Sequence, residues 1–265
     1  YQALFSNTTA DNNTAVGYQA LSVNTEGHSN NAFGYRALRC NTTADSNTAM
    51  GFCALFANTT GTLNNAVGSG SLMANTTGCC NVAVGHDSMR FNTTGDGNVA
   101  IGNKALFCNN GSTPDFNVAI GRQAVYSTTT GYRNVGVGLN SLYSTTTGYN
   151  NVAIGDAALY SNTTGHRNVG IGQCALYTVA GAGNENTAMG YSSGCTLTTG
   201  DENVFVGYRA GFNVTTGSCN IMIGSSACID SGGTHTSISM GYAVVSINDA
   251  FTFGSGSTDS RIAFG

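Results

Sequence analysis

The sequence predicts an all-β protein, a parallel β-solenoid (β-roll) of about fifteen coils of 17 residues. The first observation is a motif, Asn-x-small-apolar-Gly, that recurs along the chain. The second is its spacing, which is 17 residues except between Gly102 and Gly121, where it is 19, and between Gly172 and Gly190, where it is 18. The motif glycines are Gly17, Gly34, Gly51, Gly68, Gly85, Gly102, Gly121, Gly138, Gly155, Gly172, Gly190, Gly207, Gly224 and Gly241. Helices do not fit, because Gly or Asn interrupts every run before ten residues accumulate.

The composition supports a regular, hydrogen-bonded body. Only 8% of the 265 residues are charged and 41% are hydrophobic, so apolar side chains suffice for a core. The formal net charge is -4, and the 9 basic residues are scattered singly, which argues against a nucleic-acid partner. No apolar run approaches the roughly 18 residues of a membrane helix, so we expect no membrane span.

The first element of each coil is an asparagine four residues before the motif glycine. Stacked at the spacing of β-strands, identical amides can donate and accept along the axis. We therefore predict an asparagine ladder, here called the ladder column. Its members are Asn13, Asn30, Asn47, Asn64, Asn81, Asn98, Asn117, Asn134, Asn151, Asn168, Asn186, Asn203 and Asn220.

The second element is a short strand between the asparagine and the glycine. The residue directly before the glycine is always large and apolar, and the residue three before it is mostly Val, Ile or Thr, so we expect these two positions to form the core. The residue between them is small and points to the other face, where we expect close packing against a neighbouring chain. This small column comprises Ala15, Ala32, Ala49, Ala66, Ala83, Ala100, Ala119, Gly136, Ala153, Gly170 and Ala188.

A second strand and a closing turn complete the expected coil. The segment after the glycine, such as Tyr18 to Leu21, ends in a recurring leucine that we expect to complete the core. Asn-Thr-Thr-Gly or Thr-Thr-Thr-Gly then closes the coil, as at Asn75 to Gly78 and Thr128 to Gly131. The Leu column comprises Leu21, Leu38, Leu55, Leu72, Leu106, Leu142, Leu159 and Leu176.

The chain divides into regular and irregular parts. Residues 1–241 hold the regular repeats, and residues 242–265 hold C-terminal coils with a shortened period. The longer insertion, Asn109 to Phe116, contains the one proline, Pro114, and reads as a surface loop.

The Asn13–Gly17 and Asn117–Gly121 units, NTAVG and NVAIG, resemble the head repeats of trimeric autotransporter adhesins. With the NTTG turns and the longer period, the chain is similar to the repeat regions of bacteriophage and giant-virus tail-fibre proteins. The resemblance implies a left-handed β-roll, a homotrimer, and a structural fibre or adhesin segment, extracellular or on a virion surface. It also implies that residues 242–265 lead to a C-terminal chaperone that trimerises the chain and then cuts itself off.

Other functions receive less support from the residues. The acidic residues lie mostly singly in turns, so we expect no enzyme and no catalytic residues. No column is acidic and the four histidines lie far apart, so we expect no metal and no cofactor. The nine cysteines have no common spacing and read mainly as small buried hydrophobes, with irregular or interchain disulfides as the alternative.

The main alternative is an ice-binding or other surface-templating solenoid, because Thr columns can order water. Against it, adjacent threonines on a strand would point to opposite faces. A host receptor or glycan could bind at the tyrosines Tyr126, Tyr143, Tyr160 and Tyr177 or at the Pro114 loop, although a stacked aromatic column would also explain those tyrosines. The Asn-Thr-Thr sequons read chiefly as turn asparagines, and glycosylation is the alternative.

Overall fold

In the computed structural model, residues 1–110, 115–181, 183–233, 235–255 and 260–263 are described. The chain forms two compact units, residues 1–133 and 134–265. Each unit is a parallel β-solenoid, and no helix occurs in the described ranges. The predicted fold class is thereby confirmed. Handedness stays a prediction.

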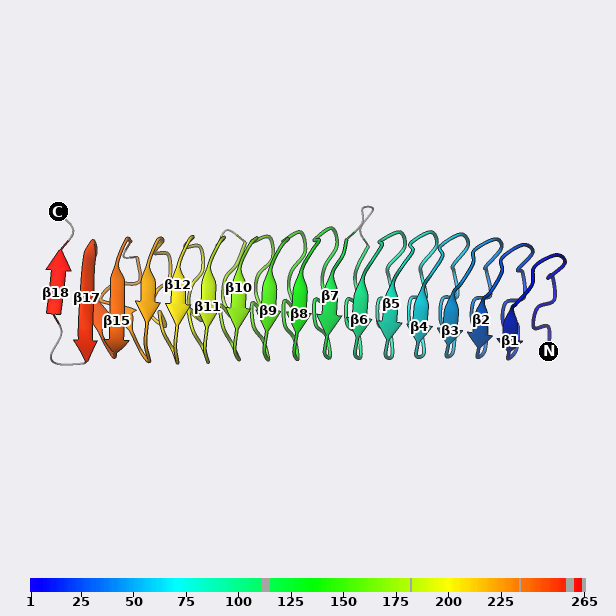
Figure 1. Ribbon diagram of the computed structural model, residues 1–265, viewed down its shortest axis with the longest axis horizontal. Helices are drawn as coiled ribbons and strands as arrows, with labels where there is room; N and C mark the ends of the chain where they lie inside the picture. The colour runs from blue at the N-terminus through cyan, green and yellow to red at the C-terminus, as the bar shows by residue number, and fades with distance from the viewer. Residues whose placement is uncertain (111–114, 182, 234, 256–259, 264–265) are drawn as a thin grey trace. The chain divides into compact units, whose positions relative to one another are not determined.

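The first unit contains one three-residue strand per coil. Each strand pairs in parallel with the strand of the next coil, so Ala15 lies opposite Ala32 and Ala83 opposite Ala100 (Figure 1). Identical columns therefore stack on one another. The strands are β1 (Thr14–Val16), β2 (Asn31–Phe33), β3 (Thr48–Met50), β4 (Asn65–Val67), β5 (Val82–Val84), β6 (Val99–Ile101) and β7 (Val118–Ile120).

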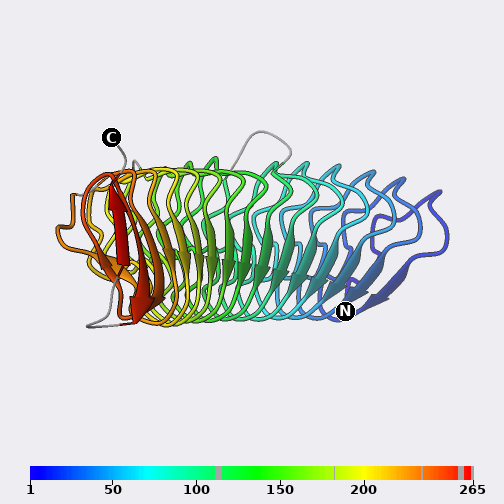
Figure 2. The same cartoon turned by 60° about the vertical axis from the view of Figure 1, so that its left-hand side comes forward.

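The second unit continues the pattern and then changes near its C-terminal end. Its three-residue strands are β8 (Val135–Val137), β9 (Val152–Ile154), β10 (Val169–Ile171), β11 (Thr187–Met189), β12 (Val204–Val206) and β13 (Ile221–Ile223). The later strands are β14 (Cys228–Ile229), β15 (Ile238–Tyr242), β16 (Val245–Ser246), β17 (Ala250–Ser255) and β18 (Ser260–Ala263). Strand β18 pairs with β17 in the antiparallel direction and β15 pairs with β17 in parallel. In Figure 2 the three-residue strands of this unit lie side by side, one in each coil, and β14 and β16 form a separate two-stranded sheet.

The prediction of a second strand in every coil is wrong. In the described residues a second pair of strands forms only near the end, where β14 pairs with β16. Elsewhere the segment after the motif glycine is a series of turns in which Gln19 has a φ of 53° and Leu21 a φ of 50°. Left-handed backbone at non-glycine residues costs about 1–3 kcal/mol each. Here it lets the chain reverse within a few residues while the Leu21 N–H donates to the Ala37 carbonyl of the next coil at 3.0 Å.

The core is formed by small and leucine side chains. The Leu column is fully buried, as the sequence predicts, and so are alanines such as Ala20 and Ala37 just before it. The motif glycines are required by geometry, because Gly17 has a φ of 133° and a Cβ there would lie 2.4 Å from the Gly34 carbonyl oxygen. Each coil is therefore narrow and fills its interior with a few small and leucine side chains.

Candidate interaction surface

The outer face of the strands carries a column of large apolar residues. Ile101 in the first unit is 40% exposed and Ile154 in the second is 41% exposed, whereas Leu106 and Leu159 of the Leu column are fully buried. The column is formed by the residue before each motif glycine. Its exposed members are Val16, Phe33, Met50, Val67, Val84, Ile101 and Ile120 in the first unit and Ile154, Met189, Ile223 and Met240 in the second.

A second column flanks the first on the same outer face, two residues earlier in each strand. Its residues are half-buried in most coils. In the first four coils it is polar, with Thr14, Asn31, Thr48 and Asn65, and from β5 onward it is mostly valine or isoleucine. The outer face therefore becomes apolar in both columns toward the C-terminal part of the first unit and through the second.

The expected orientation of the strands is wrong. The small column was expected to pack against a neighbouring chain, but its members from Ala32 onward are buried inside their own coil, and Ala15 is half-buried. A Cβ added at Gly170 would lie 3.3 Å from the Leu159 Cγ, so the small column faces the Leu column. The interior has room for leucine from one side and only for Ala or Gly from the other. The buried members are Ala32, Ala49, Ala66, Ala83, Ala100, Ala119, Gly136, Ala153, Gly170 and Ala188.

The ladder column lies at the beginning of each strand, buried from Asn30 onward. The Oδ1 of Asn30 accepts the backbone N–H of Asn47 at 2.9 Å, and the Nδ2 of Asn47 donates to the Gly61 carbonyl at 2.9 Å. The second unit has the same pattern, since Asn168 N–H donates to Asn151 Oδ1 at 3.0 Å. The asparagines thus bond along the column through backbone N–H groups and, in several steps, also amide to amide as the sequence predicts, for example from Asn81 Nδ2 to Asn64 Oδ1 at 3.1 Å. In the last step Ser237 N–H donates to Asn220 Oδ1.

A second asparagine ladder, which sequence reasoning missed, runs through the closing turns of the first unit. Its residues, here called the turn column, are Asn7, Asn24, Asn41, Asn58, Asn75, Asn92 and Asn109. Each Nδ2 donates to the Oδ1 of the preceding member, at 2.8 Å between Asn75 and Asn58. It also donates to the carbonyl three residues later, as from Asn75 to Gly78 at 2.9 Å. The period-17 recurrence of this asparagine, equal to that of the first ladder, was the available signal.

The turn column also bears on the sequons. Asn41, Asn58, Asn75 and Asn92 are fully buried, and the Nδ2 atom that a glycan would occupy already donates two hydrogen bonds in each. A glycan cannot be attached there without breaking the turn. These asparagines are therefore structural.

The paired threonines lie side by side on the outer edge of the turns. The expectation that they point to opposite faces assumed a strand, whereas this segment is a bend, so the alternation of a strand does not apply to it. Thr59 Oγ1 donates to the Thr76 carbonyl at 3.0 Å, and Thr60 beside it is exposed. Two adjacent threonine columns therefore run along this edge.

The tyrosines proposed for receptor binding form stacked columns. The Tyr143 and Tyr160 rings are 5.1 Å apart and nearly parallel, as are those of Tyr160 and Tyr177. Tyr126 stacks on Phe107 in the same way. Stacking covers the ring faces that a sugar would need and leaves only the edges open. The other expected site, the Pro114 loop, lies outside the described residues.

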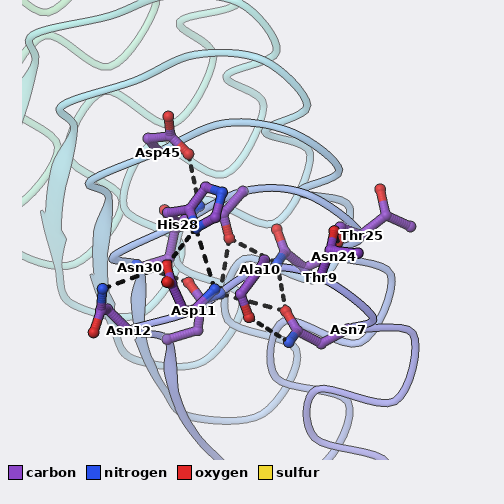
Figure 3. A network of polar contacts seen from close by, with 12 residues as sticks. Asn7, Thr9, Ala10, Asp11, Asn12, Asn24, Thr25, His28, Asn30 and Asp45 are labelled. Atoms are coloured by element: carbon purple, nitrogen blue, oxygen red, sulfur yellow. Dashed lines mark hydrogen bonds and ion pairs between the residues drawn. The ribbon is translucent and has the colours of Figure 1, made fainter.

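Polar side chains on the outside of the coils form short ladders. In Figure 3, His28 Nδ1 lies 2.5 Å from Asp11 Oδ1, and the His28 backbone N–H donates to Asp45 Oδ1 at 2.6 Å. Cys79 N–H likewise donates to Asp96 Oδ1. These side chains accept hydrogen bonds from backbone N–H groups of the preceding coil. Their role is structural.

The cysteines and acids were further candidates for metal binding. Across the described ranges, no three His, Cys, Asp or Glu side chains converge to hold a metal ion. All nine cysteines are free thiols. Burial, together with the Asp96 carboxylate, raises the pKa of Cys79 to about 12, so that thiol stays protonated at neutral pH.

Comparison of the chain with protein-family models, curated proteins and solved structures finds no match. Within the described ranges there is also no helix with the length and apolar character needed to cross a membrane.

Proposed function

We propose that the chain is a structural segment of a fibre or adhesin that associates with copies of itself through the outer face of its strands. It acts as a rigid spacer, on a virion or outside the cell, and can carry an attachment surface for a host receptor or glycan. No catalytic step and no cofactor belong to this role.

The observation that supports this proposal is the exposed apolar column before the motif glycines. Scattered apolar residues on a surface are ordinary, but a contiguous apolar face on a protein with 8% charged residues marks an interaction site. Every coil presents the same kind of residue at the same place. A partner with the same period matches this surface along its whole length, and a second copy of the chain has that period.

The number of chains in the assembly comes from the resemblance of the NVAIG and NTAVG units to trimeric adhesin heads and viral fibres. We therefore propose a homotrimer in which outer strand faces meet at the centre. This replaces the interface through the small column, which lies inside each coil.

The decisive experiment is the mass in solution by light scattering. We expect three times 27.0 kDa for the native chain. Replacing Ile154→Lys and Ile171→Lys places two charges on the outer face without touching the core, and should give a folded monomer. Thr147→Lys on the exposed turn edge is the matched control and should stay trimeric. A native monomer, or a double variant that remains trimeric with unchanged circular dichroism, contradicts the proposal.

A second candidate function is the ordering of water or ice by the turn edge. The observation in its favour is that neither threonine of these pairs is buried: Thr59 and Thr76 are half-buried, and Thr60 and Thr77 are exposed. Against it, the first hydroxyl of each pair is already bonded to a backbone carbonyl. Thermal hysteresis that disappears in Thr60→Lys with Thr77→Lys, and persists in Ile154→Lys, would favour this candidate over the fibre.

A further inference from the structure

Four buried polar side-chain atoms described in the first unit lack a protein hydrogen-bond partner, and they are Arg39 Nε, Asn109 Oδ1, Asp115 Oδ1 and Thr128 Oγ1. The last three belong to fully buried residues. Leaving a buried polar atom unpaired costs about 1–3 kcal/mol, so such atoms normally have a partner.

The cause is the end of the asparagine ladder in the turn column. Asn109 Nδ2 donates backward to Asn92 Oδ1 at 2.8 Å, which directs its Oδ1 forward to the next coil. Asn92 Oδ1, the equivalent oxygen one coil earlier, accepts this hydrogen bond from Asn109 Nδ2. The next member of the column after Asn109 is Thr128, which has no amide to donate.

The carboxyl group of Asp115 lies beside the same amide. Its Oδ2 accepts from Asn109 Nδ2 at 2.9 Å and from Asn98 Nδ2 at 3.4 Å. A glycine carbonyl accepts the equivalent bonds in regular coils, as Gly78 does from Asn64 and Asn75. The residue that ends the insertion thus brings a carboxyl group into the interior, with its second oxygen unpaired.

We propose that one buried water molecule links these three groups, donating to Asn109 Oδ1 and Asp115 Oδ1 and accepting from the Thr128 hydroxyl. Thr128 is shorter than asparagine, and neither its Oγ1 nor Asn109 Oδ1 has a protein partner, so no direct bond joins them across the ~4.8 Å between neighbouring coils. Two hydrogen bonds of ~2.8 Å through one water span that gap. A water molecule can donate two hydrogen bonds, one to Asn109 Oδ1 and one to Asp115 Oδ1. It can also accept one from the Thr128 hydroxyl, which makes three bonds in all.

A metal cation fits this site less well than water. Three protein oxygens are fewer than the roughly six to eight that Ca²⁺ takes. Burial also raises the pKa of Asp115, because desolvation disfavours the charged carboxylate that would bind a cation.

Two variants of the full chain test the water. If the hydroxyl bonds to water, Thr128→Val removes one of its three bonds and should lower the thermal midpoint by about 2–4 °C. If the hydroxyl is simply unpaired, the same change should raise the midpoint. Thr128→Asn is the matched variant: its amide can donate to Asn109 Oδ1 directly, so it should displace the water and keep or raise the midpoint.

A high-resolution crystal structure of the native chain and of Thr128→Asn completes the test. We expect one water peak within about 2.7–3.2 Å of all three oxygens in the native chain and none in the variant. An empty site, a peak with cation distances of about 2.3–2.6 Å, or a raised midpoint in Thr128→Val overturns the proposal.

Discussion

The closing turns of the first unit are built around buried amides, whereas most of those in the second unit are built around apolar side chains. In the first unit the turn column is asparagine from Asn7 to Asn109, whereas in the second it becomes Val179, Leu197 and Val214, all fully buried. The backbone is the same in both, since Thr76 N–H donates to the Thr93 carbonyl at 2.8 Å and its counterparts in the second unit do likewise. The same turn backbone therefore accommodates either buried amides or apolar side chains at this position.

The cores of the two units differ in a second way. In regular coils the strand contributes Ala and the opposite wall contributes Leu. At Phe205 the strand contributes the large side chain, and the Leu column becomes Gly194 and Gly211. A Cβ at Gly211 would lie 2.2 Å from Phe205 Cδ1 and one at Gly194 2.5 Å from Cδ2. The volume of the side chains in the core is kept, because the strand now provides the large residue and the position of the Leu column provides glycine.

The largest expected effect on stability comes from changing the phenylalanine of this altered core. Phe205→Ala should destabilise the second unit by about 3–5 kcal/mol, because it leaves a cavity that the rigid coils cannot close. Adding Gly211→Leu should restore much of the loss, since leucine already adopts the required left-handed backbone in other coils, as at Leu176. Urea unfolding measures both. A double variant no more stable than Phe205→Ala would show that the two walls do not share one volume.

The reverse substitution in a regular coil should also destabilise the fold, by overpacking instead of by a cavity. Ala153→Phe adds a ring opposite an intact Leu column and should destabilise by about 1–3 kcal/mol or more. Equal tolerance of phenylalanine at residues 153 and 205 would erase the distinction between the two cores.

The next effect concerns the turn column. Asn75→Val should destabilise the first unit by about 1–3 kcal/mol, because it removes the donor to the buried Asn58 Oδ1. Val179→Asn should be nearly neutral, since its amide can reach Asn162 Oδ1, which has no protein partner. Denaturant midpoints decide the comparison. If Asn75→Val is harmless, the ladder is a by-product of the repeat and not a source of stability.

A smaller, pH-dependent effect is expected at Asp115. Burial raises its pKa above the ordinary 3.8, so the folded state holds the proton more tightly than the unfolded state. Its contribution to stability is full below the unfolded pKa and is lost as pH rises toward the folded pKa. Asp115→Asn cannot lose a proton, so its thermal midpoint should rise relative to that of the native protein as the pH increases above the ordinary pKa of 3.8. A difference between the two midpoints that does not change with pH would contradict a raised pKa of Asp115.

The last prediction is that the asparagines of the turn column stay unmodified. Folded protein secreted from a glycosylating host should carry no glycan on Asn41, Asn58, Asn75 or Asn92, because their amides are buried and bonded. Intact mass measures this directly. Glycan heterogeneity at these sites in protein with native circular dichroism would show that the turn column opens.

The repeat made most of the fold predictable. A constant period of 17 and an asparagine before each strand predicted stacked coils and a ladder, and the structure has both. The missed second ladder and the absent second strand have one cause. Local patterns such as Asn-Thr-Thr-Gly or Tyr-Gln-Ala-Leu fit a strand as well as a chain of turns, and only the bonds to neighbouring coils choose between them.

By itself, then, the sequence determined the period, the parallel stacking and the positions of the ladder asparagines and buried leucines, because these follow from identical residues repeated at one spacing. Only the tertiary structure decided which face of each strand is the inside. Alternation separates Ala100 from Val99 and Ile101 but does not say which side closes the coil. Hydrophobicity suggests the larger residues, yet the opposite wall already supplies leucine, so the interior accepts alanine and the larger side chains are left outside.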